Sequence, residues 1–205
     1  MCNLYSLTRA QDAMRHLFDG VALADKLGNL APLPEIYPDQ AAPIVRHGAE
    51  GYEMVMGRWG MPTPAPFLEG KKTDRGVTNI RNAGSPHWRQ WAATSHRCLV
   101  PLSKFAEPGR GGNVWFGFPD DRPAFFAGLW TRWTSVRKLK DGETTDDLFA
   151  FLTTEPNAEV AAHHPKAMPV LLTDPADWTH WMTAPWREAL ALQKPYPDDE
   201  LVLIE

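Results

Sequence analysis

The sequence predicts a single α+β domain built on a curved, mostly antiparallel, barrel-like β-sheet with a few flanking helices. Short apolar segments typical of strands outnumber the helical segments, and turn-forming residues separate most of them. No repeat or low-complexity block divides the chain. With 205 residues, of which 43% are hydrophobic and 22% charged, the chain is long enough for one large core, so we assign residues 1–205 to one domain.

The first elements are a predicted helix and a predicted loop. Apolar residues from Thr8 to about Leu27 recur at steps of three and four, and Thr8 followed by Gln11 resembles a capping box. Prolines then make residues 29–41 a loop, and three further prolines make residues 60–76 irregular.

Most remaining elements are predicted strands, and a few are short helices. The expected strands cover residues 42–47, 52–59, 97–105, 114–118, 124–130, 148–153, 168–172 and 201–204. The expected short helices cover residues 86–93, 156–162, 175–183 and 185–192. A turn at 48–51 joins the first two strands, residues 114–118 and 124–130 form a hairpin, and residues 132–147 form a polar protruding loop.

Charge is distributed unevenly along the chain. The formal net charge is −4, yet residues 58–110 hold nine Lys or Arg residues and three acidic residues, a net charge of +6. Trp59, Phe67, Trp88 and Trp91 lie among these cations. Interleaved cations and aromatic rings suit single-stranded nucleic acid, because they neutralise phosphates and stack on bases. A solvated basic face over ordinary core aromatics accounts for the same pattern.

Other features restrict the cellular setting and the cofactors. No apolar run approaches the roughly 18 residues of a membrane span, and no signal peptide precedes the domain, so we expect a cytoplasmic protein without a membrane partner. The only cysteines are Cys2 and Cys98, there is no CxxC pair, and His163 and His164 are adjacent. We therefore expect no disulfide, metal site or cofactor.

Cys2 has the most distinctive potential chemistry. Removal of Met1 would leave Cys2 with a free α-amine and a thiol, whose ordinary pKa values are about 7.7–8.0 and about 8.5. Such a 1,2-aminothiol captures an aldehyde as an imine, and the sulfur then closes a thiazolidine ring. An internal cysteine cannot do this because its nitrogen is in an amide. The alternative is a cysteine that merely follows the start codon.

Several short motifs accompany Cys2 in a fixed order. They are Met1-Cys2-Asn3-Leu4, Arg58-Trp59-Gly60-Met61, Thr78-Asn79-Ile80-Arg81, Arg97-Cys98-Leu99-Val100-Pro101, Phe105-Ala106-Glu107-Pro108, Leu152-Thr153-Thr154-Glu155 and His163-His164-Pro165-Lys166-Ala167-Met168-Pro169. Each motif is weak alone, but the ordered set resembles the SRAP family of SOS response-associated peptidases over nearly the whole chain.

The resemblance implies a function in the DNA-damage response. SRAP proteins recognise abasic sites in single-stranded DNA and crosslink to them as a thiazolidine through an N-terminal cysteine, which shields the lesion. The family is also credited with removing the residue before that cysteine, so we expect autopeptidase activity, or else an aminopeptidase, to release Cys2, together with lyase-like activity. By motif, the implied catalytic residues are Cys2, Asn79, Glu107 and His164.

The chemistry of these positions agrees with that assignment. Opening an abasic sugar and forming an imine require proton transfers, which a carboxyl and an imidazole can provide. Glu107 follows a buried strand, so desolvation would raise its pKa, and His164 can shuttle protons near neutral pH. Asn79 can orient a group without titrating. In isolation, each residue is better explained as a turn, cap or packing residue, and only the joint occurrence in family order favours function.

The expected DNA contacts combine the resemblance with the basic segment. Arg58, Arg81 and Arg110 would contact phosphates, and Trp59 or Phe67 would stack on a base. Thr153 is a further expected DNA contact. The expected partner is single-stranded DNA containing abasic sites, and a monomer suffices for the chemistry.

The sequence also departs from the family pattern. Asn3 and Leu4 replace the commoner Gly-Arg after the cysteine, and Pro108 replaces a tryptophan after the glutamate. The segment between the histidine and Met-Pro is one residue longer than usual, which leaves both His163 and His164 as candidates, and we choose His164.

Two other functions remain open from the sequence. One is a cysteine hydrolase in which the α-amine of Cys2 is the base for its own thiol. The other is a non-covalent single-stranded DNA-binding module in which Cys2 has no chemical role.

Overall fold

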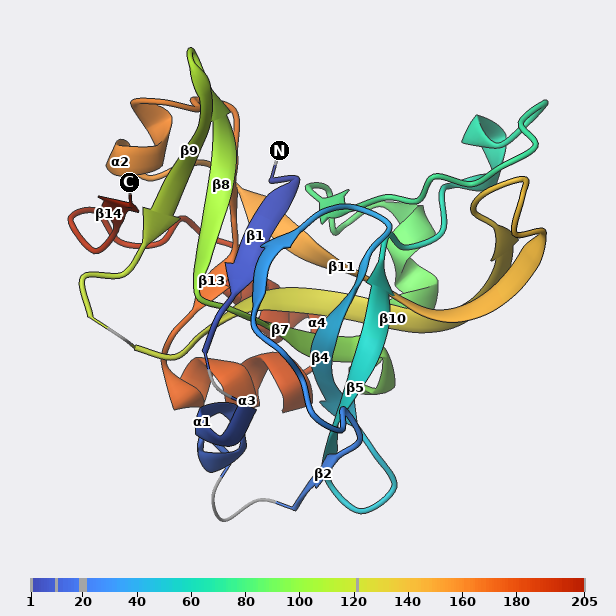
Figure 1. The fold of residues 1–205 in the computed structure, drawn as a ribbon, viewed down its shortest axis with the longest axis horizontal. Helices are drawn as coiled ribbons and strands as arrows, with labels where there is room; N and C mark the ends of the chain where they lie inside the picture. The colour runs from blue at the N-terminus through green and yellow to red at the C-terminus, as the bar shows by residue number, and fades with distance from the viewer. Residues whose placement is uncertain (1, 10, 19–21, 121, 205) are drawn as a thin grey trace.

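A closed barrel of five strands forms the centre of the computed structural model, which describes residues 2–9, 11–18, 22–120 and 122–204 (Figure 1). Its strands are β4 (Ala41–His47), β5 (Tyr52–Trp59), β7 (Arg97–Leu102), β10 (Ala124–Val136) and β11 (Glu143–Thr154). They pair in the order β4-β5-β11-β10-β7 and back to β4, and only β5–β11 is parallel. The predicted single α+β fold with a curved, mostly antiparallel sheet is confirmed.

A second sheet carries the start of the chain. Its strands are β1 (Leu4–Leu7), β3 (Leu33–Ile36), β8 (Lys104–Gly109), β9 (Gly112–Gly117) and β14 (Val202–Ile204). They pair in the order β14-β9-β8-β1-β3, and all pairs are antiparallel. Strand β1 lies inside this sheet, so both of its edges are hydrogen-bonded.

Tyr5 joins the two sheets. Its ring packs edge-on against Trp59, Phe126 and Phe151 of the barrel, with centroid separations of 5.2, 5.3 and 6.1 Å. All four side chains are fully buried. Edge-to-face pairs of this kind add roughly 0.5–1.5 kcal/mol each beyond the area they bury. The aromatic cluster therefore fixes β1, and with it Cys2, against the barrel.

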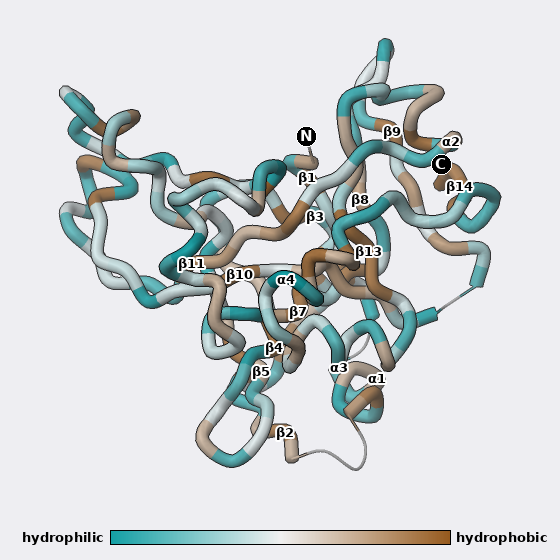
Figure 2. Tube along the Cα trace, turned by 180° about the vertical axis from the view of Figure 1, so that it is seen from behind, coloured by the Kyte–Doolittle hydropathy of each residue, from teal (hydrophilic) through white to brown (hydrophobic). Residues whose placement is uncertain are grey.

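Two helices, α1 (Gln11–His16) and α3 (Pro175–Thr183), lie at one end of the barrel (Figure 1). Helix α3 packs on β7, and the indole nitrogen of its Trp181 donates to the carbonyl of Cys98 at 3.0 Å. Helix α1 lies beside α3 (Figure 1). Figure 2 shows that the most hydrophobic stretches follow the central strands. Within the described ranges, no helix has the length and apolar character needed to span a bilayer.

Short elements complete the fold. They are β2 (Leu23–Asp25), β6 (Asn79–Ile80), β12 (Met168–Pro169), β13 (Leu171–Leu172), α2 (Ala158–Ala161), α4 (Trp186–Ala189) and 3₁₀ turns at Ala65–Phe67, Pro86–Trp91, Thr94–His96 and Leu190–Leu192. Strands β6 and β12 both pair with β11, and this places two of the candidate catalytic segments on the same barrel strand.

The predicted first helix is wrong over much of its length. Only Gln11–His16 is helical, Leu23–Asp25 is strand β2, and residues 19–21 of the prediction lie outside the described residues. The apolar period has another cause, because Phe18 packs against the rings of Phe125 and Trp178 after the helix has ended.

The predicted loop at 29–41 also contains a strand, β3 (Leu33–Ile36). Within this strand, Pro34 is tolerated because β3 is the edge of its sheet and needs no second set of backbone donors.

A predicted hairpin and a predicted loop differ as well. Strand β9 pairs with β8 and β14 and not with β10, so residues 114–118 and 124–130 form no hairpin. The polar segment 132–147 is mostly strand, because β10 and β11 continue as a projecting hairpin that is exposed on both faces. Residues 97–105 and 168–172 each divide into two strands, whereas the β4–β5 hairpin and helix α3 are confirmed.

Candidate functional site

The four candidate catalytic residues meet where the second sheet joins the barrel. Cys2 precedes β1, and Glu107 lies on the neighbouring strand β8. Asn79 begins β6, and His164 lies between α2 and β12. They come from distant parts of the sequence, and only the pairing of β1 with β8 and of β6 and β12 with β11 brings them together.

Asn79 holds the backbone of Cys2. Its Nδ2 donates to the carbonyl of Cys2 at 2.8 Å and to Oγ1 of Thr78 at 2.8 Å. Its backbone is fixed beside Phe151 in the β6–β11 pair. Its Oδ1 is buried and has no hydrogen-bond partner in the described part of the chain. The asparagine therefore positions Cys2 and keeps one acceptor available for a substrate or an amine.

The surroundings of the Cys2 thiol favour its protonated form. The residue is fully buried, and Sγ lies 3.5 Å from the carbonyl oxygen of Leu4. Burial, and secondarily the charge of Glu107, raises the pKa of the thiol well above its ordinary value. A neutral thiol suits a reaction in which an amine attacks first and the sulfur adds second.

Glu107 and His164 lie together as the two titratable side chains expected to transfer protons. His164 Nε2 lies 3.6 Å from Glu107 Oε2, and the side chains are 11% and 0% exposed. Burial raises the pKa of Glu107 to about 7, and burial lowers the pKa of His164. Both shifts favour the uncharged forms, and a carboxyl with a pKa of about 7 can exchange a proton near neutral pH.

The structure separates the two adjacent histidines. The backbone nitrogen of His164 donates to Val160 at 2.7 Å, and Asn157 caps this short helix by accepting from Val160 N at 3.1 Å. His164 thereby faces Glu107. His163 is exposed, and its ring contacts Phe116 at 6.0 Å. Only His164 thus belongs to the cluster.

A pocket of about 470 Å³ opens beside these residues. The residues next to Cys2, Asn79 and Glu107 in the sequence contribute to its wall. The lining residues are Asn3, Leu4, Tyr37, Pro38, Arg75, Gly76, Thr78, Ala106, Pro108 and Asn113. A ligand in this pocket would therefore contact the immediate neighbours of three candidate catalytic residues.

Arg81 and Thr153 lie close to the site. Gln193 connects them, since its side-chain amide donates to the carbonyls of both residues at 2.9 Å. The Arg81 guanidinium forms an exposed ion pair with Glu155. Thr153 is fully buried. No pattern in the sequence singled out Gln193, because it lies far along the chain from both partners.

Two other expected DNA contacts are placed differently. Arg58 is held by both carboxylate oxygens of Asp39 at 2.8 and 3.0 Å and by Asp146 at 3.1 Å, so it is already neutralised. Trp59 is fully buried, and its indole donates to the carbonyl of Thr78 at 3.0 Å. Neither residue presents itself to a DNA strand. Trp59 instead supports the backbone next to Asn79.

The remaining expected contacts are on the surface. Phe67 is 65% exposed, so its ring is available for stacking, and Arg110 is exposed at the turn between β8 and β9.

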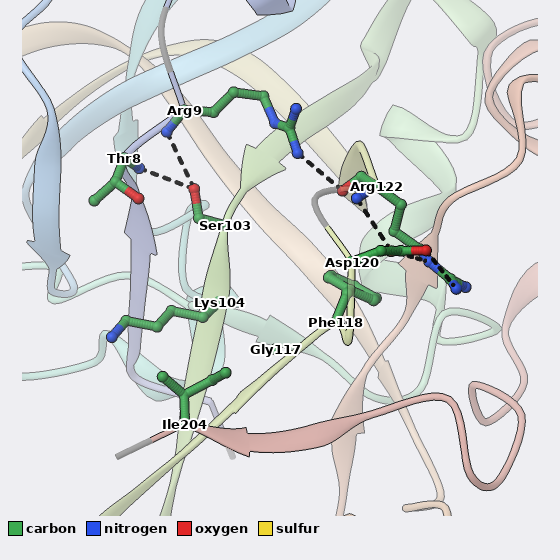
Figure 3. Close-up of a pocket in the computed structure, with 9 residues that line it drawn as sticks. All are labelled: Thr8, Arg9, Ser103, Lys104, Gly117, Phe118, Asp120, Arg122 and Ile204. Atoms are coloured by element: carbon green, nitrogen blue, oxygen red, sulfur yellow. Dashed lines mark hydrogen bonds and ion pairs between the residues drawn. The ribbon is translucent and has the colours of Figure 1, made fainter.

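A separate pocket of about 390 Å³ lies at the other end of β1 and β8 (Figure 3). It contains none of the candidate catalytic residues. Its Arg122 is engaged by Asp120 at 2.7 Å and Glu200 at 2.6 Å, and Lys104 lies 4.7 Å from the centre of the Trp115 ring. We therefore place the candidate site at Cys2 and not in this pocket.

Comparison with known proteins identifies the family. The family model described as SOS response associated peptidase (SRAP) matches residues 1–205. A crystal structure of a Bordetella bronchiseptica protein is similar at TM-score 0.74 and 24% identity, covering 100% of both chains. A Bacteroides thetaiotaomicron protein is similar at TM-score 0.75 and 18% identity, covering 100% of this chain and 92% of its own.

A phage-related protein from Bordetella bronchiseptica has a TM-score of 0.69 at 19% identity, with 99% of this chain and 93% of that chain covered. These three structures share the fold. No curated protein matches the chain. Because the family model covers every residue, the chain belongs to the SOS response associated peptidase family.

Proposed function

We propose that this protein binds abasic sites in single-stranded DNA and, once Cys2 is the first residue, traps them as a covalent thiazolidine. Membership of the family supports a DNA-damage-associated, peptidase-like role. The observation that carries the more specific proposal is the meeting of Cys2, Asn79, Glu107 and His164 beside one pocket. Together they hold an aminothiol, an amide acceptor and an acid–base pair.

Each residue has a defined task in the proposed reaction. The Cys2 amine adds to the C1′ aldehyde of the opened sugar, and the carbinolamine loses water to give an imine. The thiol sulfur then bonds to C1′ while its proton passes to the nitrogen. Glu107 protonates the departing hydroxyl, His164 moves protons to and from the sugar oxygens, and Asn79 Oδ1 accepts a hydrogen bond from the amine.

The surroundings of Cys2 favour trapping over hydrolysis of peptides in trans. A cysteine hydrolase requires a thiolate that attacks first. Here burial raises the pKa of the thiol well above its ordinary value, whereas in trapping the amine attacks first. A non-covalent module would not need a buried carboxyl with a pKa of about 7, and strongly perturbed groups cluster at reactive sites.

Intact-mass measurement tests the proposal. The purified protein is measured with and without an abasic oligonucleotide, and it should lose residue 1 and gain the oligonucleotide mass minus one water. Cys2→Ala should give no heat-stable adduct. Cys98→Ala, which removes the other cysteine, should crosslink normally. A full adduct yield from Cys2→Ala would overturn the proposal, and turnover of amide substrates without DNA would favour the hydrolase.

A further inference from the structure

We propose that one flank of the abasic strand leaves the site along a basic track and ends with a base stacked on Trp133. This inference rests on the proposed function. The track lies on a projecting arm, which we define as residues 61–78 together with the hairpin tip at residues 132–143. The two segments project from the same side of the barrel in both views (Figures 1 and 2).

The arm is a fixed structure and not a loose loop. The backbone nitrogen of Asp74 donates to Val136 on β10 at 2.9 Å. The buried Asp74 carboxylate accepts from the backbone nitrogens of Thr63 at 3.1 Å and Gly76 at 2.8 Å. At the base of the arm, Arg137 donates to the carbonyl of Arg75 at 3.2 Å. These bonds hold the cations of the arm in a defined place.

Three contiguous pockets lead from the reaction site along the arm. The pocket beside Cys2 includes Thr78 and Arg75. Arg75 also lines a second pocket, of about 460 Å³, together with Lys71 and Lys72. Both lysines line a third pocket, of about 270 Å³, together with Trp133. Shared lining residues thus connect the surroundings of Cys2 to an aromatic ring.

The cations of this track are available for phosphates. Lys71, Lys72 and Arg75 are exposed, and none forms an ion pair with a described residue. Of the nearby acids, Asp74 is occupied by its bonds to the arm and Glu69 is exposed. Unpaired cations along a groove match the backbone of a single strand, which carries one negative charge per nucleotide.

Trp133 is placed to receive a base. The side chain is 41% exposed, and its ring meets the buried ring of Trp91 edge-on, with centroids 6.2 Å apart at 84°. This contact sets the orientation of the indole while leaving part of its surface open. Base–aromatic stacking accepts any base, so the site fits a flank of arbitrary sequence.

Binding measurements with truncated substrates test the track. Abasic oligonucleotides are shortened stepwise from the 5′ side or the 3′ side, and affinity is measured with Cys2→Ala so that no crosslink forms. Trp133→Ala and the double variant Lys71→Ala/Lys72→Ala are each made in that background. We expect each to lose roughly tenfold in affinity for the long substrate and little for the substrate lacking the relevant flank.

Two controls sharpen the result. Trp133→Phe should retain most of the affinity because a ring remains. Arg187→Ala/Lys194→Ala makes the same change in charge at exposed positions that line none of the three pockets, and should bind like the parent. The double lysine variant should also flatten the dependence of log affinity on log salt by about 1.4, at about 0.7 per phosphate contact.

The outcomes separate this inference from the proposed function. Equal loss for long and short substrates, or no loss for either, overturns the track. An acidic peptide that binds Lys71 and Lys72 while DNA affinity stays constant would also overturn it. In a Cys2-containing background, normal crosslinking of short substrates by the arm variants shows that they fold. Absence of any crosslink from wild type would instead remove the proposed function.

Discussion

The reaction site and the arm use charge in opposite ways. At the site, Glu107 and His164 are largely desolvated. Burial raises the pKa of Glu107 and lowers the pKa of His164, and both shifts favour the neutral side chain. On the arm, Lys71, Lys72 and Arg75 are exposed to solvent. Buried groups suit proton transfer, whereas exposed cations suit salt-dependent attraction. The comparison teaches that chemistry and affinity are carried by different regions and should be separable by mutation.

The largest expected effect is on the rate of the chemical step. Glu107→Gln keeps the size of the side chain but removes the acid, so the crosslinking rate should fall roughly 10²–10⁴-fold. Affinity for an abasic strand measured without crosslinking should change little. Single-turnover gels and equilibrium titration measure the two quantities. A parallel loss of affinity would break the proposed separation between site and arm.

The pH dependence of crosslinking sharpens the role of the same residue. Because the pKa of Glu107 is raised to about 7 by burial, its protonated form is present below pH 7 and disappears above it. The wild-type rate should carry an inflection near that pH, with the Glu107-dependent component falling as the pH rises. The inflection should be absent in Glu107→Gln. An unchanged profile in the variant would assign the titration to another group.

Glu107→Gln should raise stability near neutral pH, although the same substitution lowers the crosslinking rate. The folded-state pKa of about 7 lies above the ordinary 4.5, so ionising Glu107 costs free energy in the folded protein. Wild type should lose stability relative to Glu107→Gln as the pH rises from 4.5 to 7, by at most about 3 kcal/mol. Denaturant melts at acidic and neutral pH measure this difference, and a constant difference would contradict it.

Loosening the arm should affect flank binding without affecting the chemistry. Asp74→Ala removes the carboxylate that accepts from Thr63 and Gly76, which should cost about 1–3 kcal/mol of local or global stability. Long abasic strands should bind more weakly, and short ones should crosslink at the wild-type rate. Hydrogen exchange on residues 61–78 measures the loosening. Slower crosslinking of short strands would mean that the arm also supports the site.

The smallest expected effect concerns Arg81, which lies close to the site. Its ion pair with Glu155 is exposed, and such pairs contribute roughly 0.2–1 kcal/mol. Glu155→Gln should therefore raise affinity for an abasic strand by about two- to fivefold, because a phosphate no longer competes with the carboxylate. Weaker binding by this variant would indicate that Glu155 orients Arg81 and does not compete for it.

The strands of the barrel could be predicted from the sequence better than the elements that surround it. Alternating apolar strands such as β4 and β5 could be recognised because one face of each enters the core. The helix expected up to about Leu27 failed because Phe18 is buried by tertiary contacts and not by helix geometry. The inner halves of β10 and β11 could be recognised as strands, but their outer halves could not, because polar residues predominate there.

The site was predicted from the order of its motifs, and not from the spacing within any one of them. Distances among Cys2, Asn79, Glu107 and His164 depend on strand pairings that no single stretch of sequence encodes. The sequence could not show that Asp39 neutralises Arg58, since partners so far apart give no pattern. Trp133 was overlooked because the segment that holds it was interpreted as a loop.

The packing of Tyr5 against three aromatic rings of the barrel affects how long a trapped lesion would persist. Strand β1, which follows Cys2, is hydrogen-bonded to a neighbouring strand along both edges, so it does not unfold independently of the sheet. A protease that degrades the adduct could not bind the backbone near Cys2 until this part of the domain unfolded. The unfolding rate of the protein would then set how long the lesion stays protected.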